Sequence, residues 1–157
     1  MSTPIKWFSS KFYKEREATV DDYEFLFELK KLAEFDAIKS VFGWDESLQW
    51  KLHLAEWNEA KPTIIEISGK RAGSYLLQNK GDSLYFGRFF LLPEFHGKGI
   101  GSSILKQCIA IASKENKRIE LCYLQGSRVA SLYGRHGFSV TSENENFVFM
   151  ERLASCS

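Results

Sequence analysis

The chain has 157 residues, of which 44% are hydrophobic and 15% aromatic, so it is long and apolar enough to bury one core. Its 21 lysines and arginines nearly balance its 20 aspartates and glutamates. A net charge of +1 gives no broad field that would attract nucleic acid or an anionic membrane. We expect a single domain over residues 1–157, with residues 1–10 as a loosely packed N-terminal extension.

The cysteines and the N-terminal residues bear on metal binding and location. Cys108, Cys122 and Cys156 lie far apart with no CxxC pair, and the histidines show no metal-ligand spacing, so we expect no metal site and a reduced, cytoplasmic setting. The first ten residues lack the apolar core of a signal peptide, and no apolar run is long enough to cross a bilayer. We therefore expect neither a membrane nor a nucleic-acid partner.

The first predicted elements are a strand over residues 12–18 and a helix that runs from Thr19 to about Lys39. The stretch from Thr19 to Asp22 has the pattern of a capping box, which opens a helix. Apolar residues then recur three or four positions apart and predict one buried face, made of Phe25, Leu26, Leu29, Leu32 and Phe35. Gly43 ends this pattern.

A second helix, capped by Asp45 or Ser47, is predicted to end before Pro62. Alternating residues between short turns then predict an antiparallel meander of three strands, over residues 63–68, 71–78 and 83–92. Phe42, Trp44, Trp50 and Trp57 make the two-helix region rich in aromatic side chains.

The remaining elements follow a glycine-rich loop. A helix over residues 100–116 is predicted to bury the stripe formed by Ile100, Ile104, Cys108, Ile111 and Ala112. The pattern then predicts a strand, a short helix and two final strands, over residues 118–124, 127–136, 138–140 and 146–153.

The glycine-rich loop, residues 96–101, reads HGKGIG and leads directly into the predicted helix. The first N–H groups of a helix have no partner within it, and the helix dipole makes that end partly positive, so an anion is stabilised there. Glycines let a phosphate approach the main chain closely. A dinucleotide fingerprint would need glycine at Ser102, and a P-loop would need serine or threonine after Lys98, so both nucleotide motifs are excluded.

The loop instead resembles Gln/Arg-x-x-Gly-x-Gly/Ala, the pyrophosphate-binding signature of the GNAT superfamily of N-acetyltransferases. FFLLPEF before the loop is similar to the end of that family's fourth strand, and SLYGRHGF after it is similar to the family's LY-x-x-x-GF element. Similar motifs cover residues 84–138, and a similar element order covers residues 12–153. The resemblance implies the α/β (α+β) GNAT fold, a mixed, mostly antiparallel sheet of about seven strands flanked by helices.

The same resemblance implies acetyl-CoA as cosubstrate and assigns site residues. The main chain of Leu91 would contact the pantetheine arm where the fourth and fifth strands separate. The pyrophosphate would lie on the loop, whose residues here are His96, Gly97, Lys98, Gly99, Gly101 and Ser102. Tyr133 matches the family's proton donor to the departing thiolate, and a phenol is protonated at neutral pH.

The implied reaction is direct attack of a primary amine, from a small molecule or a peptide, on the acetyl group. A base must first neutralise the amine; the sequence does not identify it among Asp45, Glu46 and Glu66. The family commonly has an asparagine whose side chain contacts the pantetheine arm. This chain has Gly126 at that position, so Gln125 or Ser127 would have to make the contact instead.

The sequence is also compatible with two other functions. One is a non-catalytic acyl-CoA-binding module on the same fold, and the other is an acetyltransferase that acts on protein N-termini or lysines. One or two of the aromatic side chains in the two-helix region could line a pocket for an apolar or aromatic acceptor. A homodimer is also left open.

Overall fold

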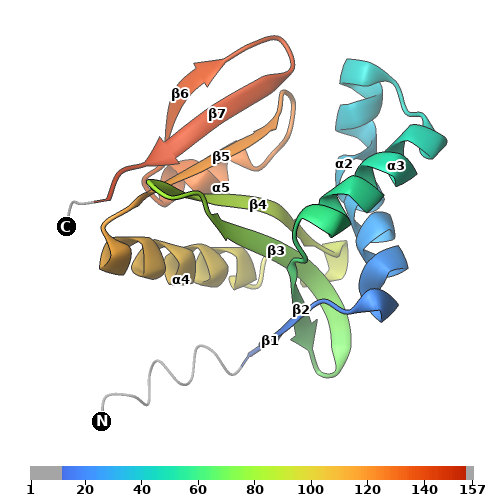
Figure 1. The fold of residues 1–157 in the computed structure, drawn as a ribbon, viewed down its shortest axis with the longest axis horizontal. Helices are drawn as coiled ribbons and strands as arrows, with labels where there is room; N and C mark the ends of the chain where they lie inside the picture. Colours follow the sequence, from blue (N-terminus) through green and yellow to red (C-terminus); the bar gives the residue numbers. More distant parts are fainter. Residues whose placement is uncertain (1–11, 155–157) are drawn as a thin grey trace.

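The computed structural model describes residues 12–154, so the expected extension over residues 1–10 and Cys156 lie outside the described residues. One seven-stranded sheet organises the chain, in the order β1-β2-β3-β4-β5-β7-β6 (Figure 1). Only β4 and β5 pair in parallel, and every other neighbouring pair is antiparallel. The predicted fold, a mixed and mostly antiparallel sheet of about seven strands with flanking helices, is confirmed.

The elements follow one another in the predicted order. The strands are β1 (Lys14–Glu17), β2 (Thr63–Ile67), β3 (Lys70–Asn79), β4 (Ser83–Leu91), β5 (Arg118–Leu124), β6 (Ser139–Glu143) and β7 (Phe147–Arg152). The helices are α2 (Tyr23–Phe42), α3 (Glu46–Glu59), α4 (Ile100–Glu115) and α5 (Ala130–Arg135), with short 3-10 turns η1 (Val20–Asp22) and η2 (Pro93–Phe95). None of the helices described between residues 12 and 154 is both long and apolar enough to cross a membrane.

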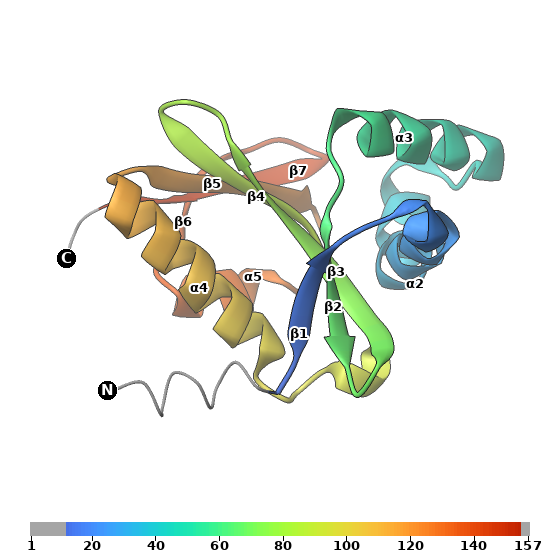
Figure 2. The ribbon, with the colours of Figure 1, turned by 60° about the horizontal axis from the view of Figure 1, so that its bottom comes forward.

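The helices form two layers, with α2 and α3 against one face of the sheet and α4 and α5 against the other (Figure 2). Neighbouring side chains of a strand point to opposite faces. Ile64 of β2 accordingly packs with Leu26 and Leu29 of α2, whereas Ile65 belongs to the larger cluster around α4. Both isoleucines are fully buried, so the sheet is covered on both sides at its centre.

The predicted buried face of α2 is correct at Leu26 and Leu29 but wrong at Leu32, whose exposed fraction is 64%. The cause is α3, which packs on a second side of α2. Phe27, outside the predicted face, stacks on Trp50 of α3 with ring centroids 3.6 Å apart. The buried surface of α2 is therefore divided between the sheet and a helix, and Leu32 faces neither.

Two helix ends also differ from expectation. Helix α2 continues to Phe42 and ends at Gly43, whose positive φ of 79° suits a residue without a side chain. Helix α5 covers only residues 130–135, because the chain makes turns before Ala130, with Gly126 at φ 88°. On α4 the predicted stripe is buried except for Ile111, which lies at its exposed edge.

Asp22 joins the first strand to the first helix. Its carboxylate is buried and accepts hydrogen bonds from the N–H of Thr19 at 2.8 Å and from Arg16 at 2.8 Å and 3.0 Å. Arg71 of β3 donates to the same carboxylate at 3.2 Å. The predicted capping box is confirmed, although it opens the 3-10 turn η1 before α2 begins.

We expect Asp22→Asn to lower the free energy of unfolding at pH 7 by about 3 kcal/mol, because two guanidinium groups lose their buried counter-charge. The hydrogen bonds from Arg16 hold the pKa of Asp22 well below its usual value. This stabilisation is therefore complete above about pH 5 and is lost as the pH falls toward the folded-state pKa. Urea unfolding at several pH values should show the gap between variant and parent closing in acid, and exposed Asp21→Asn is the control. A constant gap would contradict the assignment.

Candidate active site

Strands β4 and β5 pair over a short stretch and then separate. Only Ser83–Tyr85 pair with Arg118–Glu120, although the strands have nine and seven residues. Beyond this stretch the two strands diverge, as Figure 1 shows. The gap between them exposes the main chain of β4 on the side that does not pair with β3.

A β-bulge at Arg88 accompanies the separation. The register between β3 and β4 shifts between Ser74 and Leu76, and Arg88 has a positive φ of 49°, which costs a non-glycine residue about 1 kcal/mol. The Arg88 guanidinium donates to the carbonyl oxygens of Glu56 and Ala60 at the end of α3, at 3.0 Å and 2.8 Å. These bonds fasten α3 to the bulged strand and offset the strain.

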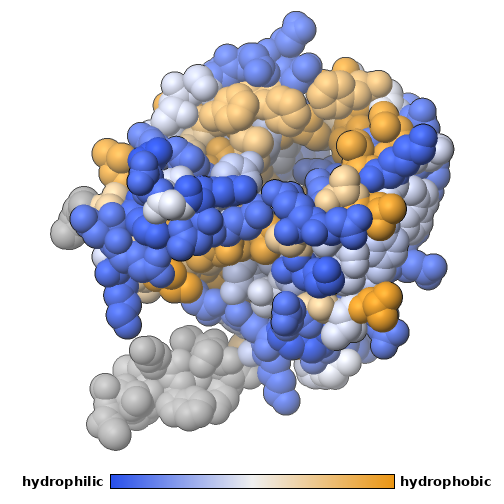
Figure 3. Space-filling view, in the orientation of Figure 1, coloured by the Kyte–Doolittle hydropathy of each residue, from blue (hydrophilic) through white to orange (hydrophobic). Residues whose placement is uncertain are grey.

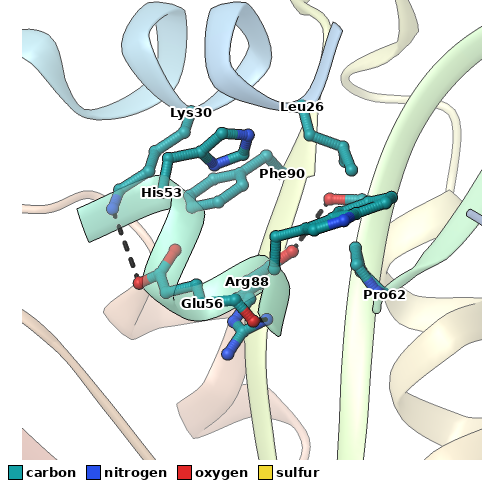
Figure 4. Close-up of a pocket in the computed structure, with 9 residues that line it drawn as sticks. Leu26, Lys30, His53, Glu56, Pro62, Arg88 and Phe90 are labelled. Carbon is teal, nitrogen blue, oxygen red and sulfur yellow. Dashed lines mark hydrogen bonds and ion pairs between the residues drawn. The ribbon is translucent and has the colours of Figure 1, made fainter. Parts of the chain in front are cut away.

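A small cavity of about 30 Å³ lies beside this bulge, between α2, α3 and the sheet (Figure 4). Leu26 and Lys30 of α2, His53 of α3 and Phe90 of β4 contribute to its lining. Its volume corresponds to about one water molecule, so it cannot hold an acceptor.

The glycine-rich loop leaves its backbone N–H groups free. Gly97 and Gly99 adopt positive φ values of 75° and 81°, and α4 begins at Ile100 without a capping side chain. The first N–H of this stretch to bond to the main chain is that of Ser103, which donates to the carbonyl of Gly99 at 3.0 Å. Among residues 12–154, no acceptor is found for the N–H groups of residues 97–102. Six successive donors at a helix N-terminus can bind an anion.

Leu91 and His96 lie where the loop leaves β4. The N–H of Leu92 donates to the carbonyl of Ala72 on β3, so the main-chain groups of Leu91, the preceding residue, point into the gap. The Nε2–H of His96 donates to the Leu91 carbonyl at 2.9 Å. The imidazole therefore ties the loop to the strand, and the N–H of Leu91 stays available to a ligand.

For the coenzyme A ligand that the resemblance implies, we expect His96→Ala to weaken binding about fivefold, the loss of roughly one hydrogen bond of about 1 kcal/mol. Catalytic turnover at saturating acetyl-CoA should be unchanged, because the imidazole ties the loop and touches no reacting atom. Titration calorimetry and steady-state kinetics separate the two effects. A fall in turnover without a change in affinity would contradict this positioning role.

The remaining predicted loop residues have distinct surroundings. Lys98 is exposed, and the Ser102 hydroxyl forms a hydrogen bond of 3.0 Å with the Nε2 atom of His136. Burial and then the nearby charges of Lys106 and Arg135 lower the pKa of His136. The mouth of the gap is thus bordered by several cationic side chains, which favours a polyanion.

Tyr133 of α5 lies in the buried cluster beneath the gap, with an exposed fraction of 6%. Its ring packs against Phe86, Tyr123 and Phe138, at centroid distances of 6.3 Å, 6.0 Å and 5.8 Å. No residue between 12 and 154 forms a hydrogen bond with its hydroxyl. Burial, followed by the negative charge of Glu34, raises the pKa of Tyr133. The phenol therefore remains protonated and able to donate.

The carboxylates that the sequence left open as bases have other partners. Asp45 caps α3 by accepting from the N–H of Leu48 at 3.1 Å. Glu46 is exposed and accepts from Trp44 and Lys31. Glu66 forms a 2.7 Å ion pair with Arg16. It lies on β2, which is separated from β4 by β3.

Gln125 and Ser127 follow the end of β5. The side-chain amide of Gln125 donates to Glu143 and to the carbonyl of Asn144, so it holds the β6–β7 hairpin. The Ser127 oxygen accepts from the N–H of Val129 at 3.4 Å and keeps its own proton free to donate. Of the two, Ser127 is the one with a donor to spare.

The open side of the gap faces an apolar border. Figure 3 shows a hollow in the centre of this face, with apolar side chains gathered above it between the β6–β7 hairpin and the upper end of α2. Phe42 of α2 and Phe147 of β7 meet there, with ring centroids 6.1 Å apart. In the part of the chain that the structure describes, no group of histidine, cysteine and acidic side chains could hold a metal ion.

Comparison with known proteins gives a family and a set of similar folds. A family model described as the acetyltransferase (GNAT) domain matches residues 58–140, more than half of the chain. No curated protein is matched as a relative.

Three solved structures illustrate the similarity of fold. The PaiA N-acetyltransferase of Thermoplasma acidophilum in complex with coenzyme A has a TM-score of 0.67 and 17% identity, covering 90% of this chain and 98% of that one. The ribosomal-protein-S18-alanine N-acetyltransferase of Escherichia coli has values of 0.68 and 15%, covering 92% and 96%. A GNAT family acetyltransferase of Elizabethkingia anophelis with acetyl-CoA bound has values of 0.64 and 15%, covering 90% and 98%.

Proposed function

This chain belongs to the GNAT family of acetyltransferases, and we propose that it transfers the acetyl group of acetyl-CoA to a primary amine by direct attack. The observation that carries the proposal is the convergence of three features on one gap. These are the free N–H groups of residues 97–102, the inward main chain of Leu91 and the unpaired hydroxyl of Tyr133.

The cosubstrate fits the gap from the loop inwards. The diphosphate accepts hydrogen bonds from the amides of Gly97, Lys98, Gly99, Gly101 and Ser102, at the positive end of α4. The pantetheine arm runs along the free edge of β4, where the N–H of Leu91 bonds to it as a strand neighbour would. Because His96 occupies the Leu91 carbonyl, the contact at this residue is a donated hydrogen bond.

The chemistry depends on charge that develops at sulfur. Attack of the neutral amine on the thioester carbon forms a C–N bond, and the C–S bond then breaks. A thiol of pKa about 8.5 leaves more readily if its sulfur is protonated as it departs, and Tyr133 is the donor. The buried aromatic rings around Tyr133 exclude water from this step.

A thiol-release assay tests the proposal. Acetyl-CoA is incubated with the protein and a panel comprising spermidine, 2-phenylethylamine, free amino acids, a peptide with a free N-terminus and a peptide with an internal lysine. We expect a chromogenic thiol reagent to detect release that requires one class of amine. Acetyl-CoA should also raise the melting temperature of the protein by mass action.

The assay separates the remaining readings. Release that depends only on peptides would assign a protein acetyltransferase. A thermal shift without thiol release from any amine would identify a non-catalytic acyl-CoA-binding module. Absence of both would refute the proposed use of acetyl-CoA.

A further inference from the structure

Helix α2 directs one line of side chains toward the bulged part of β4. Leu26 and Ile38 on this line are buried, and Lys30 lines the cavity beside Phe90. Residues four apart on a helix share one face. Glu34 therefore lies between Lys30 and Ile38 on the side of α2 that faces the sheet, and its side chain is half-buried.

The Glu34 carboxylate has no hydrogen bond or ion pair with any residue between 12 and 154. Lys30, one turn earlier, pairs instead with Glu56 of α3 at 3.7 Å (Figure 4). An ionised carboxylate without a partner is costly to bury, and such groups concentrate at functional sites. Lys30 attracts the carboxylate without pairing with it, so the charge of Glu34 is only partly compensated.

Glu34 also stands within electrostatic reach of Tyr133 across the gap. Its negative charge is the largest contribution after burial to the raised pKa of that phenol. The carboxylate belongs to α2 and the hydroxyl to α5, two helices that lie against opposite faces of the sheet (Figure 2). This is the arrangement that a reaction needs if it takes a proton from one atom and gives a proton to another.

We propose that Glu34 binds the ammonium group of the acceptor and takes its proton, an assignment that rests on the proposed acetyltransferase function. The partnerless carboxylate on the sheet-facing line of α2, opposite Tyr133, carries this inference. The acceptor is then an amine that binds as a cation, with its ammonium group directed at Glu34 on α2.

Glu34 and Tyr133 together account for the two protons that the ammonium group of the acceptor loses. An alkyl ammonium of pKa about 10.4 is protonated at pH 7 and cannot attack. Glu34 accepts its first proton, and the neutral nitrogen bonds to the acetyl carbon. As the C–S bond breaks, Tyr133 protonates the sulfur and regains a proton from the nitrogen. The products are the amide, the thiol and neutral Glu34, which returns its proton to water.

The protonation of Glu34 and the acidity of Tyr133 are coupled in a direction that favours the reaction. Burial, countered in part by Lys30, raises the pKa of Glu34, which moves it toward the pH at which a base works. Once Glu34 is neutral, its charge no longer holds the proton on Tyr133. Proton uptake from the acceptor therefore makes Tyr133 a stronger acid when the thiolate forms.

The test compares Glu34→Gln with Glu28→Gln, an exposed glutamate on the same helix. With the most active amine of the panel at pH 7, Glu34→Gln should lower kcat/KM about 10²-fold or more, and Glu28→Gln should leave it unchanged. Trifluoroethylamine, whose fluorines leave it neutral at pH 7, needs no base for its first proton. The loss with this amine should therefore be only a few-fold.

The pH profile gives an independent readout. Charged and titratable groups that face Glu34 are Lys30, Glu56 and Tyr133. In the parent, kcat/KM should fall as the pH drops through the raised pKa of Glu34. In Glu34→Gln this limb should be replaced by a rate that rises about tenfold per pH unit with the fraction of neutral amine. Retention of the parent limb, or an equal loss with both kinds of amine, would overturn the proposal.

Stability and cofactor binding distinguish this role from a structural one. Because the folded-state pKa of Glu34 is raised, its charge destabilises the fold at neutral pH, so Glu34→Gln should have a higher melting temperature. Its affinity for coenzyme A should equal that of the parent. A destabilised variant with weaker binding would assign a structural role. If the parent itself releases no thiol with any amine, the proposed function fails, independently of Glu34.

Discussion

Tyr133→Phe should lower turnover by about 10² to 10⁴-fold while leaving the fold and the affinity for coenzyme A intact. The hydroxyl forms no hydrogen bond among residues 12–154, so its removal leaves no partner unsatisfied. The ring keeps its contacts with Phe86, Tyr123 and Phe138. The variant thus removes the hydroxyl group that is the proposed proton donor and leaves the ring in place.

Three measurements check this result: kcat by thiol release, affinity by calorimetry and melting temperature. Tyr23→Phe on α2 is a matched control, since its hydroxyl is also without a described partner and its ring packs on His53 and Trp57. We expect Tyr23→Phe to retain full activity. A Tyr133→Phe enzyme with unaltered turnover would remove the acid role, and one that melts much earlier would place Tyr133 in packing alone.

The sequence predicts best those elements that bury one continuous face. Helix α4 packs on the sheet with a single face, so its repeat of apolar residues identifies the buried side apart from Ile111. Helix α2 contacts both the sheet and α3. Its apolar residues are spread around the helix, and the repeat alone cannot assign Leu32 to solvent.

The same distinction applies to the site. The loop proposed to bind the diphosphate is contiguous, and the proposal follows from local glycines and a helix start, so residues 97–102 can be identified from the sequence. The Arg88 bulge depends on the register between β3 and β4 and on where α3 ends. Glu34 looks like any helical glutamate until α2 is seen beside the gap. Neither residue carries a local signal that sequence reasoning could have used.

Gly101→Glu should weaken coenzyme A binding by at least about 10²-fold, or about 2.7 kcal/mol. Gly101 lies in the first turn of α4, where an added Cβ atom would come within 3.3 Å of Leu132 of α5 and 3.4 Å of Phe89 of β4. The position thus points toward apolar side chains of β4 and α5. A glutamate there would place its side chain in the proposed path of the pantetheine arm and a negative charge beside the amides proposed to bind the diphosphate.

Two further substitutions at Gly101 separate the causes of this loss. Gly101→Ala adds only the Cβ atom, and a shift of a few tenths of an ångström in Leu132 accommodates it, so affinity should fall by only a few-fold. Gly101→Gln matches glutamate in size without its charge, and the difference between the two in calorimetry measures the electrostatic part. All three should keep the parent's melting temperature in the absence of ligand to within a few degrees. If Gly101→Glu is folded and binds coenzyme A with unchanged affinity, the free amides of this turn hold no diphosphate, and Tyr133 loses the thioester that its proton was proposed to serve.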